Sequence, residues 1–364
     1  MVMDDKFLMS KEKKKKILIT GGAGFIGSNF IKYLLNKYSN IKIINYDKLT
    51  YAGNLLNLKE VEKHPEYSFI KGDICNKEKL ISVFELFKPD YIVNFAAESH
   101  VDRSILDPEE FIKTNVLGVQ NLLQCSLNCG VAKFIQISTD EVYGSLGKEG
   151  YFTENTPLDP HSPYSASKAS ADLLALAYYT TFQLPVNITR CSNNYGPYQF
   201  PEKLIPLVIS NYLRRKGVPV YGDGLNIRDW IYVEDHCSAI DSVLWNGIPG
   251  EIYNIGGNNE KTNIDVVKTI LNILGKTQPD YGISEKSITY IEDRKGHDRR
   301  YAIDSTKIQN ELGWKPMVSY EEGIKETINW YLNHQGWMNS IISEKYLTYY
   351  KKVYGNKMMA LKES

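Results

Sequence analysis

The chain has 364 residues, which is long enough for two lobes or for one large domain with an appendage. Its 43 basic and 43 acidic side chains cancel, and this balance argues against binding to nucleic acids or to a membrane surface. No apolar stretch approaches the roughly 20 residues that cross a bilayer. Residues 1–15 lack the apolar core of a secretory signal, and we expect them to form a flexible leader.

Apolar strands alternate with helices through the first half of the chain. We predict strands at residues 16–20, 41–47, 68–73, 91–97, 133–139 and 186–192. We predict helices at residues 25–38, 76–90, 108–129 and 165–182, the last one opened by Pro163. Near-continuous apolar strands in this alternation are typical of a parallel, doubly wound sheet. The predicted fold class is therefore α/β, with a Rossmann-like domain over residues 16–190.

The regular alternation ends near residue 190, where turn-forming and polar segments begin. Two later apolar segments, 229–244 and 251–257, are expected to return to the first sheet, so residues 229–258 are assigned to the first domain. The remaining residues, 191–228 and 259–350, are predicted to form a smaller α+β lobe over the carboxyl edge of the sheet. In this fold class, ligands bind at that edge.

The cysteines indicate neither a disulfide framework nor a metal site. Their number is five, which is odd, and no C-x-x-C pair occurs. Cys125 and Cys129 lie four residues apart on a predicted helix, yet two thiols do not complete a metal site. We interpret this pair as buried small apolar side chains, predict no bound metal, and expect the protein to work in a reducing cytoplasm.

The turn between the first strand and the first helix is a G-x-x-G-x-x-G motif made by Gly21, Gly24 and Gly27. Glycine allows a tight turn and a close approach of the backbone to a pyrophosphate, while the helix N-terminus offers amide donors. Asp47 ends the second strand, where a carboxylate would bind a ribose 2′-hydroxyl and repel a 2′-phosphate. These features predict a dinucleotide site that prefers NAD to NADP, with Asp73 and Ile74 placed to meet the adenine. A purely structural turn is the alternative.

Tyr164 and Lys168 form a Y-x-x-x-K pair at the start of a predicted helix, which places phenol and ammonium on one helix face. A nearby ammonium, with the positive nicotinamide ring of the cofactor, would lower the pKa of the phenol. The phenol could then take a proton from a substrate hydroxyl as hydride leaves its carbon. Such pairs are common on exposed helices. Here the pair follows a predicted dinucleotide-binding fold in the sequence, and Thr139 ends the preceding strand. In this context the pair predicts a catalytic site.

Together these motifs resemble those of the extended short-chain dehydrogenases/reductases that act on nucleotide sugars. The resemblance is carried by GGAGFIG (21–27), Asp47, STDEVYG (138–144) and the Tyr164–Lys168 pair. Within that group the chain is most similar to the dTDP-glucose 4,6-dehydratases, through the segments 46–54, 94–105, 192–206, 226–236 and 293–301. The resemblance runs from about residue 16 to beyond residue 330.

The resemblance implies a role for each polar residue of the STDEVYG segment. Tyr164, assisted by Lys168 and Thr139, would deprotonate the sugar 4-hydroxyl while NAD oxidises C4. Glu141 would remove the C5 proton, Asp140 would protonate the departing 6-hydroxyl, and hydride would return to C6. The product would be a 4-keto-6-deoxy sugar for deoxysugar (rhamnose-type) synthesis. This chemistry requires a neutral Asp140 beside an ionised Glu141, so we predict that their pKa values are separated.

The resemblance also implies two sets of binding residues. Those expected to bind the cofactor are Gly21, Gly24, Phe25, Ile26, Gly27, Asp47, Lys48, Thr50, Asp73, Ile74, Ala96, Ala97, Ser99, Thr114, Tyr164, Lys168 and Asn193. Those expected to bind the nucleotide sugar are Ser99, Thr139, Asn194, Lys203, Leu204, Pro219, Tyr221, Arg228, Asn263, Arg294 and His297. Arginine and lysine suit a pyrophosphate, although Arg228 could equally form a surface ion pair with Asp229. His100, beside Asp102, is interpreted as a hydrogen-bonded structural histidine.

Other members of the group share the glycine turn and the Tyr-Lys pair, so these motifs do not separate them. The 4-epimerases typically lack the Asp-Glu pair, while nucleotide-glucuronate decarboxylases and GDP-mannose dehydratases usually carry serine in place of Asp140. Asp140 therefore favours the dTDP-glucose type, and a relative acting on UDP-glucose stays open. A non-enzymatic NAD-binding regulator is disfavoured, because such proteins commonly lose the Tyr-Lys pair.

The resemblance further implies a homodimer held by a four-helix bundle. The predicted helices at 108–129 and 165–182 are the candidates, because helices that flank a sheet need cover on both sides. No nucleic-acid or membrane partner is expected.

Overall fold

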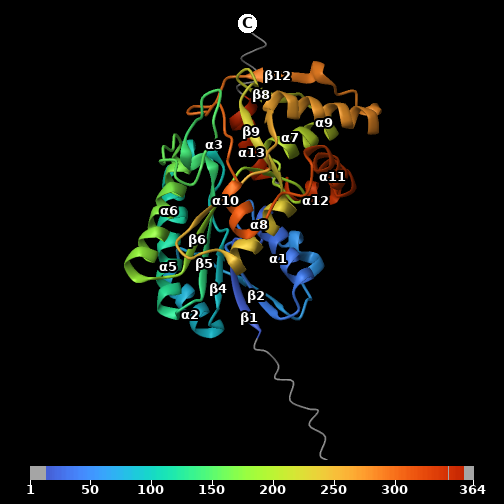
Figure 1. Cartoon of the computed structure of the whole chain (residues 1–364). Coiled ribbons are helices and arrows are strands. Elements are labelled where there is room, and N and C mark those ends of the chain that lie inside the picture. Colours follow the sequence, from blue (N-terminus) through green and yellow to red (C-terminus); the bar gives the residue numbers. More distant parts are fainter. Residues whose placement is uncertain (1–13, 343, 356–364) are drawn as a thin grey trace, which may run out of the picture.

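The computed structural model describes residues 14–342 and 344–355. The predicted leader, residues 1–15, lies outside this part of the chain except for its last two residues, and Lys15 already belongs to the first strand. A large sheet with helices on both faces forms the lower part of the molecule in Figure 1, and a smaller lobe lies above it. Within the described ranges, none of the helices is long and apolar enough to cross a membrane.

The large sheet has seven strands in the order β10-β6-β5-β4-β1-β2-β3. These strands are β1 (Lys15–Thr20), β2 (Ile41–Asp47), β3 (Tyr67–Lys71), β4 (Tyr91–Asn94), β5 (Lys133–Thr139), β6 (Val186–Cys191) and β10 (Ile252–Ile255). Every neighbouring pair is parallel. Most of their side chains are buried, because helices cover both faces, and this explains the near-continuous apolar sequence. The predicted α/β fold class is confirmed.

The strand order reverses between β1 and β4, which pair through Thr20 and Asn94 at their carboxyl ends. A crevice opens at such a reversal because the chain leaves the two strands in opposite directions. The fourth strand was predicted to reach residue 97 but ends at Asn94, and residues 95–98 leave the sheet to line this crevice. The topology thus places a ligand site where the glycine turn lies.

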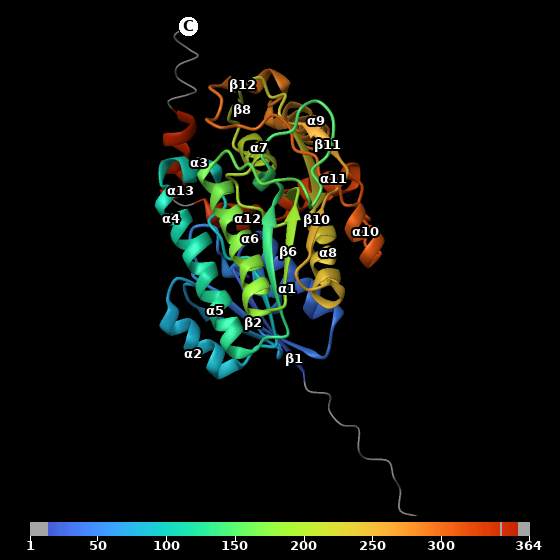
Figure 2. The same cartoon turned by 60° about the vertical axis from the view of Figure 1, so that its left-hand side comes forward.

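Two helical layers enclose the sheet. On one face α1 (Phe25–Lys37) packs against α8 (Val233–Asn246), and both bury apolar side chains such as Phe30 and Ile240. The other face is covered by α2 (Lys77–Phe87), α5 (Val119–Cys129) and α6 (Pro163–Phe182). Figure 2 shows α2, α5 and α6 together on one side and α8 on the other.

The long helix predicted at 108–129 is interrupted. It consists of α4 (Pro108–Ile112), a π-helical segment (Lys113–Gly118) and α5. π-Helical turns inside α-helices are frequent at functional sites. Here the π-helical segment carries Thr114 to the crevice, and its Gly118 is packed so closely that a Cβ would lie 2.6 Å from Ile74.

The smaller lobe is built from short strands and from the later helices. Its strands are β7 (Asn193–Tyr195), β8 (Val218–Tyr221), β9 (Ile227–Tyr232), β11 (Glu260–Thr262) and β12 (Ile288–Ile291). Its helices are α7 (Leu204–Leu213), α9 (Asn263–Thr277), α11 (Tyr320–Asn333), α12 (Gln335–Ile341) and α13 (Glu344–Tyr350). The lobe has its own apolar core, which includes Tyr212, Trp230, Ile270 and Ile324.

The two segments expected to return to the large sheet behave differently. The second one forms β10, which pairs in parallel with β6 as predicted. The first one divides: α8 covers the large sheet, but β9 pairs with β7 and β11 in a separate three-stranded sheet. The expectation for this strand is wrong, because β7 follows β6 immediately and offers β9 a nearer edge. The division of the chain into two domains stays a prediction.

Candidate active site

The glycine turn requires glycine for two measurable reasons. Gly21 has a φ of +68°, and a Cβ there would lie 2.5 Å from the Ala96 nitrogen. A Cβ at Gly27 would lie 2.5 Å from the Gly21 carbonyl oxygen. The N-terminus of α1 follows directly, with no side chain capping its amides and no acidic residue in its first turn. Its free N–H groups and positive dipole therefore face the cavity and suit an anion such as a pyrophosphate.

Asp47 sits at the carboxyl end of β2, as the sequence predicted. Its carboxylate accepts hydrogen bonds from the Ala23 nitrogen at 2.9 Å and the Leu49 nitrogen at 2.7 Å. Each carboxylate oxygen keeps a lone pair for a further donor. The cavity here is lined by the predicted residues Gly21, Gly24, Asp47, Lys48, Thr50, Asp73, Ile74, Ala96, Ala97 and Thr114. The residues present fit the ribose and adenine end of a dinucleotide.

A side-chain clamp holds the loop after β4 in place. Asn115 accepts a hydrogen bond from the Glu98 nitrogen and donates to the Glu98 carbonyl, both at 2.9 Å. It also donates to Ser167 on α6 at 2.8 Å. The π-helical segment, the loop and α6 are thereby joined, so residues 96–99 lie against the cavity wall.

The five predicted catalytic residues lie in one cavity, which is lined by Thr139, Asp140, Glu141, Tyr164 and Lys168. Thr139 ends β5 and caps the following 3₁₀ turn by accepting a hydrogen bond from the Glu141 nitrogen at 3.3 Å. Ser162 caps α6 ahead of Pro163, which starts the helix. Because α6 packs on β5, the Tyr-Lys pair faces the strand end that carries Thr139. The same cavity contains Phe25, Ile26, Gly27, Ser99 and Asn193 from the predicted cofactor set.

Asp140 and Glu141 differ in their electrostatic surroundings. Burial raises the pKa of Asp140 well above its usual range, and Glu141 raises it further. Burial also raises the pKa of Glu141, but Lys203, Arg228 and Arg294 lower it. Asp140 Oδ2 is buried without a hydrogen-bond partner among the described residues, whereas Oδ1 accepts one from Thr139 at 3.3 Å. Both pKa values are raised, but that of Asp140 is raised well above its usual range, and three cations oppose the rise at Glu141 against Arg228 alone at Asp140. This difference has the direction that the mechanism requires, and the separation of the two pKa values stays a prediction.

The protein alone does not produce the expected lowering of the Tyr164 pKa. Burial raises that pKa well above the ordinary value, and Glu141 adds to the effect. The Lys168 amine donates to the Ile137 carbonyl at 2.6 Å, and burial lowers its own pKa. Lys168 is therefore anchored to β5, and a lowering of the Tyr164 pKa by the cofactor ring stays a prediction.

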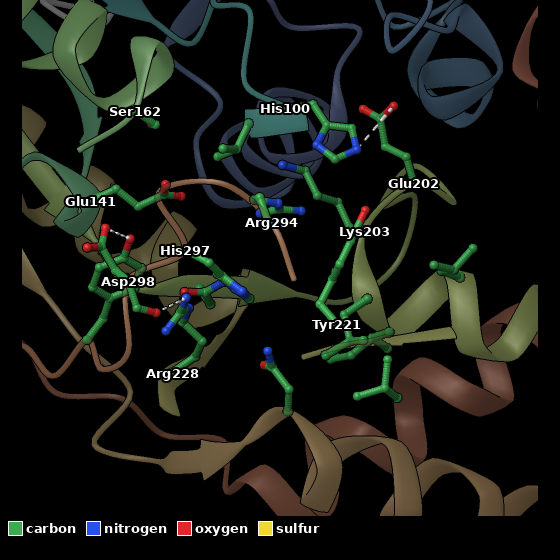
Figure 3. Close-up of a pocket in the computed structure, with 18 of the residues that line it drawn as sticks. His100, Glu141, Ser162, Glu202, Lys203, Tyr221, Arg228, Arg294, His297 and Asp298 are labelled. Carbon is green, nitrogen blue, oxygen red and sulfur yellow. Dashed lines mark hydrogen bonds and ion pairs between the residues drawn. The ribbon is translucent and has the colours of Figure 1, made fainter. Parts of the chain in front are cut away.

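The cavity that contains Tyr164 and Lys168 adjoins another one of about 150 Å³, which we call the second cavity. Both are lined by Glu141, Asn193, Asn194 and Lys203. The remaining residues predicted to bind the nucleotide sugar line this second cavity: Leu204, Pro219, Tyr221, Arg228, Asn263, Arg294 and His297. Figure 3 shows Glu141, Lys203, Arg228 and His297 arranged around it. The cavity therefore brings the Glu141 carboxylate together with cations that suit phosphates.

The two arginines are held in fixed orientations. Arg294 donates to both carboxylate oxygens of Asp102, at 2.8 and 3.0 Å. Arg228 donates to the Asp298 carbonyl at 2.9 Å, and its guanidinium lies 4.1 Å from the centre of the Tyr301 ring. Asp229 instead accepts from the Gly257 and Asn259 nitrogens, so the alternative of a surface ion pair between Arg228 and Asp229 is wrong.

The two histidines near this cavity differ. His297 lines it, and its Nδ1 lies 2.6 Å from Asp293 Oδ1. His100 also lines it and is almost fully buried, with Nε2 lacking a hydrogen-bond partner within the described residues. Burial lowers the pKa of His100 well below its usual range, and Nε2 lies 3.8 Å from a Glu202 carboxylate oxygen and 3.9 Å from one of Asp102. The hydrogen bond expected of a structural histidine is not found at this nitrogen.

Several cavity residues were not singled out from the sequence. Gln199 and Glu202 line both cavities, and Asp298 and Tyr301 line the second. Asp102, which orients Arg294, was named only as a neighbour of His100. The sequence could have pointed to Glu202 and Tyr301, because both lie in segments that resemble the family. Glu202 directly precedes Lys203, and Tyr301 ends the segment 293–301.

The comparisons with known proteins agree with this geometry. Residues 18–327 match the family described as GDP-mannose 4,6 dehydratase. The chain is 50% identical to the dTDP-glucose 4,6-dehydratase of Escherichia coli over 354 residues, covering 91% of this chain and 97% of that one. The solved structure of dTDP-glucose 4,6-dehydratase from Bacillus anthracis in complex with NAD is 54% identical and has a TM-score of 0.82, with coverage of 90% and 99%. That of the Streptomyces venezuelae enzyme, with NAD and dTDP bound, is 48% identical and has a TM-score of 0.85, with the same coverage.

The doubly wound sheet, the glycine turn and the Tyr-Lys pair define a short-chain dehydrogenase/reductase of the extended, nucleotide-sugar kind. Within this class the chain belongs to the dTDP-glucose 4,6-dehydratase family.

Proposed function

We propose that the chain is an NAD-dependent hydro-lyase that converts dTDP-glucose into dTDP-4-keto-6-deoxyglucose, a precursor for deoxysugar synthesis of the rhamnose type. The proposal rests on one observation above all: a buried Asp140 with an unpartnered carboxyl oxygen lies beside Glu141 where the two cavities meet. Elimination of water needs a base for the C5 proton and an acid for the 6-hydroxyl, whereas 4-epimerisation breaks no bond at C5 or C6. The relatives named above support the same activity.

When bound, NAD accepts hydrogen from the sugar C4 and returns it to C6, so the reaction involves no net oxidation. Tyr164 removes the proton of the 4-hydroxyl. Thr139 and the anchored Lys168 keep the phenol oxygen of Tyr164 close to the sugar 4-oxygen. The α1 N-terminus binds the pyrophosphate of the cofactor and Asp47 its ribose, which favours NAD over NADP.

The elimination uses the two carboxyl groups in turn. The ketone at C4 makes the C5 proton acidic, and Glu141 takes that proton as an ionised base. The electron pair of the C5–H bond forms the C5–C6 double bond, and the C6–O bond breaks. Asp140 gives its proton to the departing 6-oxygen, so that water leaves. The hydride taken from C4 would then add at C6, the electron pair of the C5–C6 double bond would form an enolate with the C4 ketone, and C5 would take a proton.

The second cavity holds the nucleotide. Arg294 and Lys203 contribute positive charge, and Arg228 lies against Tyr301, so the diphosphate meets guanidinium groups that are already oriented. Tyr221 and Asn263 supply a ring and an amide for the base. Because the arginines are fixed before substrate arrives, little side-chain entropy is lost on binding.

We further propose that the protein forms a homodimer through a four-helix bundle that includes α5 and α6. Leu117, in the π-helical segment before α5, is 55% exposed, and Leu173 on α6 is 58% exposed. Exposed apolar side chains that gather on adjacent helices are typical of an interface.

The described cysteines are all free thiols, which fits the predicted reducing cytoplasm.

The deciding experiment is incubation of the pure protein with dTDP-glucose in deuterated water without added reductant. We expect a 4-keto-6-deoxy product that carries deuterium at C5, with no accumulation of NADH. Glu141→Gln is the matched control, because it should neither exchange the C5 proton nor form product. Turnover of UDP-glucose or of a glucuronate in place of dTDP-glucose would overturn the proposal.

A further inference from the structure

The C-terminal segment packs against the second cavity. It consists of α13 followed by the π-helical turn Lys351–Gly355, and Figure 2 shows α13 close to α3 (Val101–Leu106). Tyr354, in the turn, is 3% exposed and lines the cavity alongside Tyr221 and Arg294. The last described turn of the chain therefore supplies part of the wall of the nucleotide-sugar cavity.

Tyr354 reaches this wall through Tyr221. The two ring centroids lie 6.1 Å apart at an interplanar angle of 44°, and both rings pack in one apolar cluster with Leu207, Ile291 and Val353. Tyr354 thus packs against the ring of Tyr221, and Val353 and Ile291 hold the two rings together.

Tyr221 in turn is part of the support of Arg294. Its hydroxyl donates to Asp102 Oδ2 at 3.2 Å, and Asp102 accepts both hydrogen bonds from the Arg294 guanidinium. The same guanidinium lies 5.1 Å from the centre of the Tyr221 ring. A continuous set of contacts therefore leads from Tyr354 to a cation that faces the diphosphate.

A second tyrosine of the segment supports the opposite wall. The Arg103 guanidinium lies between two rings, 3.6 Å from the centre of Tyr51 and 4.1 Å from that of Tyr349. Arg103 Nε donates to Glu202 at 3.0 Å, and Glu202 lines both cavities. The C-terminal segment is thus attached to the cavity at two places, each through an arginine.

We propose that Tyr354 is a positioning residue for the nucleotide sugar: it holds Tyr221 and, through Asp102, keeps Arg294 oriented toward the nucleoside diphosphate. This inference rests on the proposed function. Tyr354 does not line the cavity that contains Tyr164 and Lys168. Loss of Tyr354 should therefore weaken binding of the nucleotide sugar and leave the chemical steps and NAD binding unchanged.

The test compares wild type with Tyr354→Ala, Tyr354→Phe and a matched control, Tyr350→Ala. Tyr350 belongs to the same segment, lies 4.9 Å from the Tyr354 ring and accepts a hydrogen bond from Asn211, but it lines neither cavity. We expect Tyr354→Ala to raise KM for dTDP-glucose and Kd for dTDP about tenfold, with kcat within about twofold. Tyr354→Phe should recover most of this loss, and Tyr350→Ala should leave KM within about twofold of wild type.

An unchanged KM in Tyr354→Ala, or an equal rise in Tyr350→Ala, would mean that the segment only stabilises the fold, and would overturn the inference. If Tyr354→Ala does not fold, Tyr354→Leu, which removes the ring but keeps an apolar side chain, is combined with Tyr221→Phe. Action through Tyr221 predicts that their effects on KM do not add, and additive effects would exclude it. Absence of wild-type turnover of dTDP-glucose would instead contradict the proposed function, so the two failures are distinguishable.

Discussion

At the scale of single residues, Asp140 and Glu141 are adjacent in sequence but lie in different surroundings. The Asp140 carboxyl is buried and accepts a hydrogen bond from Thr139 at one oxygen only. Glu141 lies where both cavities meet and is influenced by Lys203, Arg228 and Arg294. Burial therefore acts on Asp140 with less opposition from cations than on Glu141, which is the direction of difference that an acid and a base in one elimination need.

We predict that Asp140→Asn permits oxidation at C4 but slows elimination by about 10²–10⁴-fold, because a positioned acid contributes that much to proton transfer. Absorbance at the NADH band should therefore accumulate in a single turnover, while the 4-keto-6-deoxy product forms slowly. Asp159→Asn, at an exposed carboxylate, serves as the control and should behave as wild type. An unchanged elimination rate in Asp140→Asn would exclude Asp140 as the acid.

Asp140 should also affect how the free energy of unfolding depends on pH. The folded pKa of Asp140 is raised, so folded protein keeps a proton that the unfolded chain, with a pKa of about 3.9, releases. The stability that this carboxyl contributes is present below the unfolded pKa and is lost as the pH rises through the folded pKa.

Asparagine at position 140 does not titrate. From pH 5 up to the folded pKa of Asp140, the free energy of unfolding of Asp140→Asn should therefore rise relative to wild type by about 1.4 kcal/mol per pH unit. Urea unfolding at pH 5, 6, 7 and 8 measures the difference. A difference that stays constant over this range would show that Asp140 ionises freely in the folded protein.

At the scale of elements, the β1–α1 connection depends on backbone approach rather than on side chains. Gly27 is in α1, where φ is ordinary, so its requirement is steric: a Cβ would collide with Gly21. The collision partner is the backbone of the turn itself, which cannot move without displacing the amides of the α1 N-terminus. Binding of the cofactor should respond to one added methyl group.

We predict that Gly27→Ala lowers the NAD content of the purified protein at least tenfold and destabilises the fold by about 1–3 kcal/mol, the usual cost of overpacking. NAD released by acid is measured by absorbance, and unfolding by denaturant titration. Gly275→Ala is the matched control: it lies in helix α9 with no atom near its would-be Cβ, and should be neutral or stabilising. Full NAD content in Gly27→Ala would contradict the steric argument.

At the scale of the whole molecule, the exposed face of α5 and α6 sets the oligomeric state that we propose. We predict that Leu173→Asp, which places a charge in the four-helix interface, converts a dimer of twice 41.6 kDa into a monomer. Light scattering coupled to gel filtration at micromolar concentration measures the mass. Leu86→Asp, at a 75% exposed leucine on α2, is the control and should stay dimeric. A wild-type monomer would refute the dimer.

The strands of the large sheet were predictable because each is a short, buried, apolar run next to a helix. β2, for example, was predicted with its observed bounds. The π-helical segment in the helix at 108–129 was not predicted, because the helical spacing of the sequence does not report it; in the structure its Gly118 packs closely against Ile74, which is far away in the sequence. The pairing of β9 with β7 was also missed, because the sequence pattern of a strand does not indicate which other strand it will pair with.

The sequence by itself determined the fold class and the glycine turn, because both depend on local spacing, and its resemblance to a family singled out the candidate catalytic residues. Only the tertiary structure decided how those residues act. It placed Arg228 on Tyr301 and Arg294 on Asp102, anchored Lys168 to Ile137, and brought Tyr354 to the cavity wall. Burial and the neighbourhood of charges set the pKa of Asp140, and these depend on segments that meet only when the chain has folded.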